Sequence, residues 1–227
     1  MKIRVYLATT QGAILLEGIS RESAPQAAIR IPRTTQTLSV SGGYDTFVHQ
    51  SSGAAEGALG LFDEGGFRLD VSAEAADGES WQLGLFVARE LKELGELAAP
   101  DDPYDEVWWL TGEVDNNLNV YSVDHLADKV RAAATDIAAI VKLGKPVTLF
   151  VPKGNVDSVN RAELPYGVRV VGVSHTSDVL EGVPHTTSAS TLELSDQVAP
   201  KVPWPERSAR GHNAAIGTVR LTSAVAV

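Results

Sequence analysis

Alternating apolar and polar positions predict a series of short strands along the chain. Residues 2–8 and 67–71 alternate strictly, which is typical of strands that bury one face. A turn at residues 9–12, followed by the short apolar run 13–16, predicts a hairpin at the start of the chain. Further strands are expected at residues 28–31, 37–40, 107–110, 118–123, 146–151 and 168–173.

Two stretches have helical rather than strand periodicity. Ser80 opens the first, where apolar residues recur at spacings of three and four and form one buried stripe. The second begins near Asp124, whose carboxylate suits an N-cap, and runs to Val141 before Gly144 ends it. Strands and helices together predict an α+β fold.

Length and composition indicate a globular protein. The chain has 227 residues, enough for one large or two small domains, with 44% hydrophobic and 21% charged residues. Its formal charge of -10 argues against nucleic acid or an anionic membrane as a partner, because both require a basic surface. With no cysteine, disulfide scaffolds and thiol catalysis are excluded.

The composition changes near residue 181. Beyond that point Thr, Ser, Pro and Ala dominate, and Pro200, Pro203 and Pro205 cluster around Trp204. We therefore expect a folded domain over residues 1–180 and a Pro/Ser/Thr-rich, partly extended tail over residues 181–227. The N-terminus has no signal-peptide pattern and no apolar run is long enough for a membrane helix, so a cytoplasmic location is expected.

The stretch 107–133 organises the rest of the chain. An apolar run leads to Thr-Gly-Glu at residues 111–113, then to a polar turn, an alternating segment and a helix. This order resembles the proteolytic domain of the Lon family of serine proteases, which has a TGE element, a hairpin and a helix starting Gly-Gly-(Leu/Ile)-Lys-Glu-Lys. Pro152 and Asn155 also stand where that family has a proline and an asparagine. The resemblance implies the Lon proteolytic fold.

The start of the first long helix carries a second part of the resemblance. Asp77-Gly78-Glu79-Ser80 stands where the Lon family has its nucleophile in Asp-Gly-Pro-Ser, which implies that Ser80 is the nucleophile. Backbone amides at a helix start can stabilise an oxyanion. The alternatives are structural: Ser80 as a plain N-cap, Asp77 as a turn former, and Thr111, which lies near the catalytic pair in that family, as a turn cap.

A gapless alignment of the helix start departs from the family. Leu126 takes the Leu/Ile position and Lys129 that of the second lysine, whereas Asp124 and His125 replace the two glycines. The position assigned to the catalytic lysine is Ala127.

Ala127 has three explanations. The domain has lost its catalytic pair; or Lys129 or His125 supplies the base; or the alanine is an introduced change. A serine hydroxyl needs such a base before it can attack. Lys129, two positions further along a helix, would point away from the face of Ala127, and His125 stands two positions before Ala127, at the start of the helix.

We therefore expect a standalone Lon-protease-like domain that retains Ser80, lacks the ordinary Ser-Lys pair and acts as a binding or assembly subunit. The alternative is an active serine endopeptidase using Ser80 with Lys129 or His125. Glu79, in place of the proline before the family's serine, and Trp81 and Gln82, in place of the small residues after it, favour the inactive form. A third option is that only the fold is shared, since ribosomal-protein-like and small-molecule-kinase domains also have it.

Motifs for cofactors are absent from the sequence. The five histidines have no metal-ligand spacing, and there is no P-loop, so neither a metal nor a nucleotide is expected. The expected partner is a protein or peptide, with an ATPase supplied by a separate chain if unfolding is needed. The resemblance also implies a homo-oligomer, because Lon proteolytic domains form rings.

Overall fold

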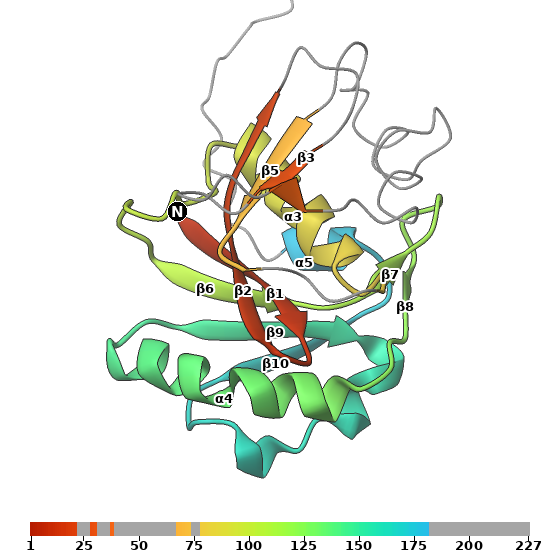
Figure 1. Ribbon diagram of the computed structural model, residues 1–227. Helices are drawn as coiled ribbons and strands as arrows, with labels where there is room; N and C mark the ends of the chain where they lie inside the picture. The colour runs from red at the N-terminus through yellow and green to blue at the C-terminus, as the bar shows by residue number, and fades with distance from the viewer. Residues whose placement is uncertain (22–27, 31–36, 39–66, 74–77, 182–227) are drawn as a thin grey trace, which may run out of the picture. The chain divides into compact units, whose positions relative to one another are not determined.

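The computed structural model describes residues 1–21, 28–30, 37–38, 67–73 and 78–181 (Figure 1). The chain divides into a unit Met1–Thr186 and a unit Thr187–Val227, and all described residues belong to the first unit. Asp77 and nearly all of the expected C-terminal tail therefore lie outside the described residues.

A mixed β-sheet of eight strands carries this unit, and its strands occur in a different order in space than in the sequence. Across the sheet they are β10 (Arg169–Val173), β9 (Val147–Pro152), β6 (Glu106–Leu110), β1 (Ile3–Thr9), β2 (Gly12–Arg21), β5 (Phe67–Val71), β3 (Ala28–Arg30) and β4 (Thr37–Leu38).

Parallel pairing holds one half of the sheet together. Strand β1 is parallel to β6, β6 to β9 and β9 to β10, whereas β1 and β2 form the expected antiparallel hairpin. A second, two-stranded sheet pairs β7 (Glu113–Val114) with β8 (Val120–Tyr121).

The helices are α3 (Gln82–Glu93), α4 (Leu126–Lys142) and the short α5 (Ser177–Leu180), with 3-10 turns at Lys153–Ser158 and Arg161–Glu163. None of the helices in the described part of the chain is long and apolar enough to cross a membrane. This mixed architecture is compatible with an α+β fold.

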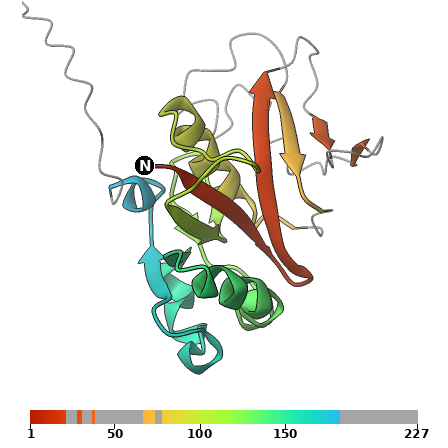
Figure 2. The ribbon, with the colours of Figure 1, turned by 90° about the vertical axis from the view of Figure 1, so that its left-hand side faces the viewer.

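Strand β6 divides the core because it is buried on both faces. Its side chains alternate, so that Val107 and Trp109 pack in the cluster that includes α4, whereas Trp108 and Leu110 pack in the cluster that includes α3. The two helices therefore cover opposite faces of the sheet, as Figures 1 and 2 show. Across the α3 side, the ring of Trp108 meets that of Phe150 edge-on, with centroids 5.0 Å apart.

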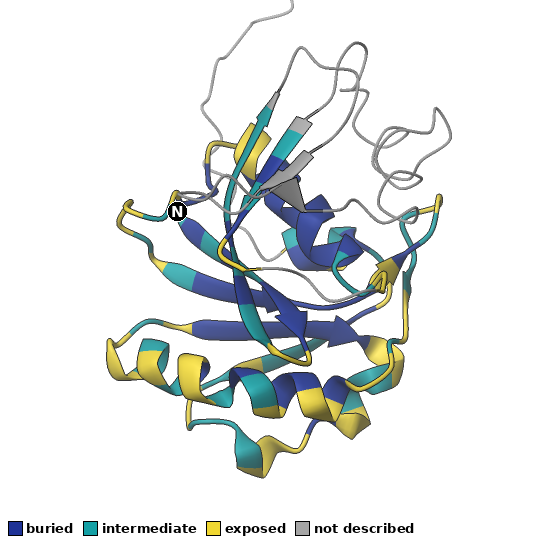
Figure 3. Ribbon diagram, viewed as in Figure 1, coloured by how far each residue is buried: buried dark blue, intermediate teal, exposed yellow. Residues whose placement is uncertain are grey.

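Helix α4 buries a single stripe of side chains against the sheet, and its other faces are exposed (Figure 3). Spacings of three and four residues put all members of the stripe on one side of the helix. One member is a lysine, which is unusual because a charged group loses its hydration when it is buried. The buried residues are Leu126, Lys129, Val130, Ala133 and Ile137.

Strand β2 is longer than its sequence pattern predicts. The apolar run that predicts this strand ends at Leu16, yet the strand continues to Arg21. The extension pairs with β5, after a register shift between Leu16 and Gly18. A strand partner supplied by the tertiary structure outweighs the weak local preference of these polar residues.

The predicted N-cap at Asp124 is wrong, and the alternative of Ser80 as a plain N-cap is not what the structure has either. The N-cap of α4 is His125 rather than Asp124, and it has a left-handed backbone with φ of 58°. The N-cap of α3 is Trp81, so Ser80 is not the cap of this helix. Neither capping residue makes a side-chain capping hydrogen bond. The Ser80 hydroxyl is therefore not engaged in capping α3.

Candidate functional site

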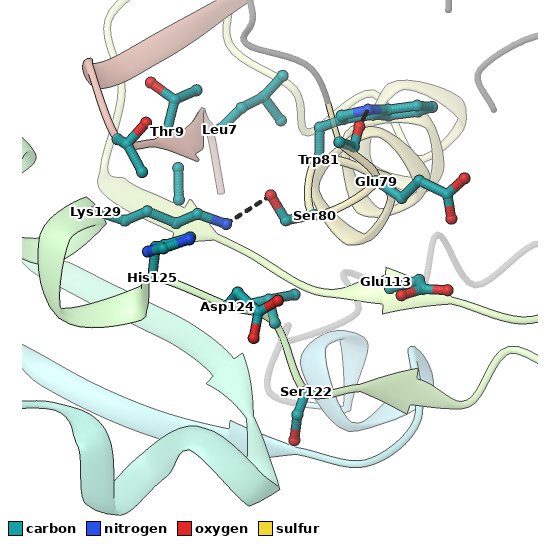
Figure 4. Close-up of a pocket in the computed structure, with 14 residues that line it drawn as sticks. Leu7, Thr9, Glu79, Ser80, Trp81, Glu113, Ser122, Asp124, His125 and Lys129 are labelled. Atoms are coloured by element: carbon teal, nitrogen blue, oxygen red, sulfur yellow. Dashed lines mark hydrogen bonds between the residues drawn. The ribbon is translucent and has the colours of Figure 1, made fainter. Parts of the chain in front are cut away.

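A pocket of about 370 Å³ opens beside the first turn of α3. It lies where the end of β1, the segment before α3, the start of β7 and the first turn of α4 come together (Figure 4). Residues far apart in the sequence thus share one cavity, of a size that suits a small ligand or part of a peptide. The lining residues are Leu7, Ala8, Thr9, Thr10, Gly78, Glu79, Ser80, Trp81, Glu113, Ser122, Val123, Asp124, His125 and Lys129.

Ser80 is fixed in the pocket through its backbone. The amide of Gly112 donates a hydrogen bond to the Ser80 carbonyl at 2.8 Å, and the amide of Leu83 donates to the Gly112 carbonyl at 3.1 Å. These bonds tie the start of α3 to the end of β6. The serine is thereby held at a defined place, whereas its hydroxyl is left to interact with side chains.

Lys129 reaches Ser80 from the first turn of α4. Its ammonium or amine nitrogen, Nζ, lies 2.7 Å from Ser80 Oγ and 3.5 Å from Thr111 Oγ1 (Figure 4). The lysine is only 6% exposed, and burial lowers its pKa from the ordinary value, with Asp124 acting in the opposite direction. A serine hydroxyl next to a buried lysine with a lowered pKa is an arrangement that can activate a nucleophile.

Ala127 was expected at the position that faces the serine, and the structure does not place it there. Ala127 is exposed and does not line the pocket, whereas Lys129 lies on the buried stripe of α4. The physical reason is the helical period: positions 127 and 129 are two apart and point in nearly opposite directions. The prediction that alanine leaves Ser80 without a neighbouring lysine is therefore wrong.

The buried stripe of α4 contained a signal for the role of Lys129 that sequence analysis missed. Lys129 is three residues after Leu126 and one before Val130, at a position that periodicity assigns to the core. A lone lysine at such a position needs a partner, which the structure identifies as Ser80.

Thr111 lies at the end of β6 and connects both members of the pair. Thr111 is fully buried. Its hydroxyl donates a hydrogen bond to the Ser80 carbonyl at 3.4 Å and accepts one from Lys129 Nζ at 3.5 Å. Both contacts are at the long end of the hydrogen-bond range and are therefore weak. The structure thus brings Thr111, Ser80 and Lys129 together.

Gly112 must lack a side chain for this junction to form. A Cβ at this position would lie 2.7 Å from Val120 Cγ1 and 3.2 Å from Leu83 Cβ. Replacing Gly112 with Ala is therefore expected to lower the free energy of unfolding by about 1–3 kcal/mol, the usual cost of overpacking a core. Urea denaturation measures this directly, and a variant as stable as the wild type would contradict the close packing. The matched control is Ala127→Ser, a small change at an exposed position, which should leave the stability unchanged. Gly78→Ala would be a poorer control: an added Cβ would meet nothing within 4 Å, but the φ of 125° would strain any residue other than glycine.

His125 lines the pocket without taking the place of Lys129. Its side chain is 71% exposed, and Nδ1 lies 3.6 Å from Asp128 Oδ2. The segment just before it is held by Asn155, which accepts from the Val123 amide at 2.8 Å and donates to the Val123 carbonyl at 3.0 Å. His125 is thus a solvated residue at the rim of the pocket, and Asn155 positions the chain that leads into α4.

Two carboxyl groups flank the pocket on the other side of Ser80. Glu79 precedes the serine, and Glu113 begins β7; in Figure 4 both lie away from Lys129. Partial burial, followed by the charge and hydrogen bond of Glu79, raises the pKa of Glu113 above its ordinary value. Sequence analysis noted Glu79 but did not pair it with Glu113, because the pairing depends on the Ser80–Gly112 junction.

The first amides of α3 are already engaged. Gln82 donates to the Glu79 carbonyl at 3.0 Å and Leu83 to the Gly112 carbonyl, so neither is free to bind an oxyanion. An oxyanion at Ser80 would need donors that precede Gln82 or hydroxyl groups of the pocket wall. Thr9 and Thr10 belong to that wall, and no feature of the sequence marked the β1–β2 turn as part of a site.

The buried amine also makes a prediction for stability. Because burial lowers the pKa of Lys129 below its unfolded value, stability should rise with pH from the folded pKa up to the ordinary value of 10.5. Below the folded pKa both states bind the proton, and the cost of burying the charge is fully present. Lys129→Met keeps the apolar stem and is expected to be more stable than the wild type at pH 7 by about 1 kcal/mol.

Urea unfolding of both proteins between pH 6 and pH 10 would test this. The difference in the free energy of unfolding between Lys129→Met and the wild type should narrow as the pH rises, because the wild type then buries a neutral amine. A wild type that is the more stable protein at pH 7 would show that the contacts of Lys129 outweigh its desolvation.

In the part of the chain that the structure describes, no group of three or more His, Asp or Glu side chains is placed to hold a metal ion. The lining of the pocket offers the hydroxyl of Ser80, the amine of Lys129 and nearby carboxyl groups. No family model matches the chain, and no curated protein matches it either.

Proposed function

We propose that this chain is a serine hydrolase in which Ser80 is the nucleophile and Lys129 the general base, and that it cleaves peptide bonds. The observation that carries the proposal is the 2.7 Å contact between Lys129 Nζ and Ser80 Oγ, made by a lysine that is 6% exposed. The distance lies within the range for proton transfer. Burial lowers the pKa of Lys129, which favours the neutral amine that a general base requires.

The proposed reaction has two steps. In the first, neutral Lys129 takes the proton of Ser80 as Oγ attacks the carbonyl carbon, and the protonated lysine then gives that proton to the leaving amine. This leaves an acyl group on Ser80. In the second, Lys129 takes a proton from a water molecule that attacks the acyl group, and returns it to Ser80 Oγ as the acid product leaves.

The resemblance to the Lon proteolytic domain supports a peptide substrate. The Thr-Gly-Glu element at residues 111–113 and the serine at the start of α3 contact each other here through Gly112 and Ser80. Under this proposal, a folded protein would have to be unfolded by an ATPase on a separate chain. Short peptides and unfolded proteins are therefore the substrates to assay first, because they need no such partner.

Covalent labelling tests the proposal without knowledge of the substrate. A small, uncharged serine-directed phosphonate should modify the wild type once per chain, and peptide mass spectrometry should locate the adduct at Ser80. Ser80→Ala should remain unlabelled, and Ser177→Ala, which removes a serine outside the pocket, should label like the wild type. Absence of an adduct at Ser80 would favour the alternative of a binding or assembly subunit without catalysis.

A further inference from the structure

We infer that the pocket selects peptides with a basic side chain, lysine or arginine, next to the bond at Ser80, and that Glu79 and Glu113 are the residues that select it. This inference rests on the proposed function and deepens it by naming the substrate class. Glu79 adjoins Ser80 in the sequence, and both glutamates line the pocket that contains the serine and the lysine.

The charge of the pocket is uneven. Its lining includes three carboxyl groups (Glu79, Glu113 and Asp124) and one lysine, which must be neutral when it acts as a base. The wall formed by Leu7, Ala8 and the two threonines carries no charge. Among these lining residues, a bound peptide would therefore meet more carboxyl groups than cationic groups.

Glu79 and Glu113 are both exposed, and both line the pocket that contains Ser80. Among the described residues neither forms an ion pair, and partial burial, helped by the negative charge of Glu79, raises the pKa of Glu113. Two adjacent carboxylates repel each other, and a cation placed between them would relieve that repulsion.

A resident metal ion does not fit this role in the described part of the chain, where no three ligands of the right kind come together. A ligand with a basic side chain would supply such a cation. An ammonium or guanidinium group can form charge-assisted hydrogen bonds with both carboxylates, whereas an apolar side chain cannot and a carboxylate is repelled.

Peptide binding to the Ser80→Ala protein tests the inference separately from catalysis. The probes are three fluorescent heptapeptides of Ala and Ser that differ only at the central position, which is lysine, norleucine or glutamate. Norleucine has the length of lysine without its charge. Fluorescence anisotropy at low salt should give the tightest binding for lysine, about fivefold tighter than norleucine, with glutamate weakest.

Two further variants in the Ser80→Ala background identify the residues responsible. Glu79→Gln with Glu113→Gln should bring the lysine and norleucine peptides to within about twofold of each other. Glu93→Gln with Glu181→Gln removes the same charge from two exposed positions outside the pocket and should keep the fivefold preference.

Equal affinity for the lysine and norleucine peptides, including no measurable binding of either, would overturn the inference. So would a preference that survives in the Glu79/Glu113 variant or disappears in the Glu93/Glu181 control. Failure of the proposed function has a different signature, namely no phosphonate adduct at Ser80 of the wild type, whatever the peptides do.

Discussion

Replacing Lys129 with Met is expected to slow the reaction of Ser80 with a serine-directed phosphonate, and the hydrolysis of a peptide substrate, by about 10³–10⁴-fold. Methionine fills the space of the lysine stem but has no basic nitrogen. Without the amine 2.7 Å from Oγ, the hydroxyl keeps its proton and is a poor nucleophile. The expected loss approaches that of Ser80→Ala, because the two residues act as a unit.

The measurement is the second-order rate of adduct formation at pH 8, followed by intact-protein mass spectrometry. Ala127→Lys is the matched control for the lysine position: because residue 127 faces solvent, it should neither change the wild-type rate nor rescue Lys129→Met. His125→Ala should leave most of the rate intact, since its side chain is 71% exposed at the rim. A Lys129→Met protein that reacts at the wild-type rate would mean that another group activates Ser80.

Much of the scaffold around this pair could be predicted from the sequence. Strand β5 lies at the predicted residues 67–71, and β1 and β6 each lie within one residue of the predicted bounds. These strands are defined by local apolar patterns that the sheet then buries. The far end of β2 and the short helix α5 could not be predicted, because a pairing partner or a neighbouring segment determines them rather than their own sequence.

The individual parts of the site could be predicted from the sequence, but the pairing of Ser80 with Lys129 could not. The serine at the start of a helix and the Thr-Gly-Glu element were identified from residue order, and in the structure Gly112 joins them. The lysine was misassigned because a gapless alignment fixes a position along the chain but says nothing about its direction. The direction follows from the buried stripe of α4, which includes Lys129 and leaves Ala127 in solvent.

The same geometry couples the reactivity of Ser80 to pH. Lys129 can accept a proton only when neutral, so labelling should be slow below its folded pKa and should rise as the pH passes through that value. Burial lowers this pKa and the carboxylate of Asp124 raises it. Asp124→Asn removes the second effect, so the rise should move to lower pH.

The variant should therefore react faster than the wild type on the acidic side of the rise, by roughly two- to fivefold, since Asp124 is exposed and its charge is screened. At high pH, where Lys129 is neutral in both proteins, the two rates should converge. An uncharged phosphonate is the right reagent, because the loss of an acidic pocket residue would also alter the binding of a basic peptide.

Asp128→Asn, which removes a carboxylate from the first turn of α4, close to Asp124 in the sequence, is the control. Its side chain contacts His125 and Arg131 on the exposed face, so its loss should leave the pH profile of labelling in place. High salt should shift the wild-type profile toward that of Asp124→Asn, because screening weakens the same interaction. A rise that moves to higher pH in Asp124→Asn, or one that is absent from the wild type, would show that Lys129 is not the base whose protonation limits the reaction.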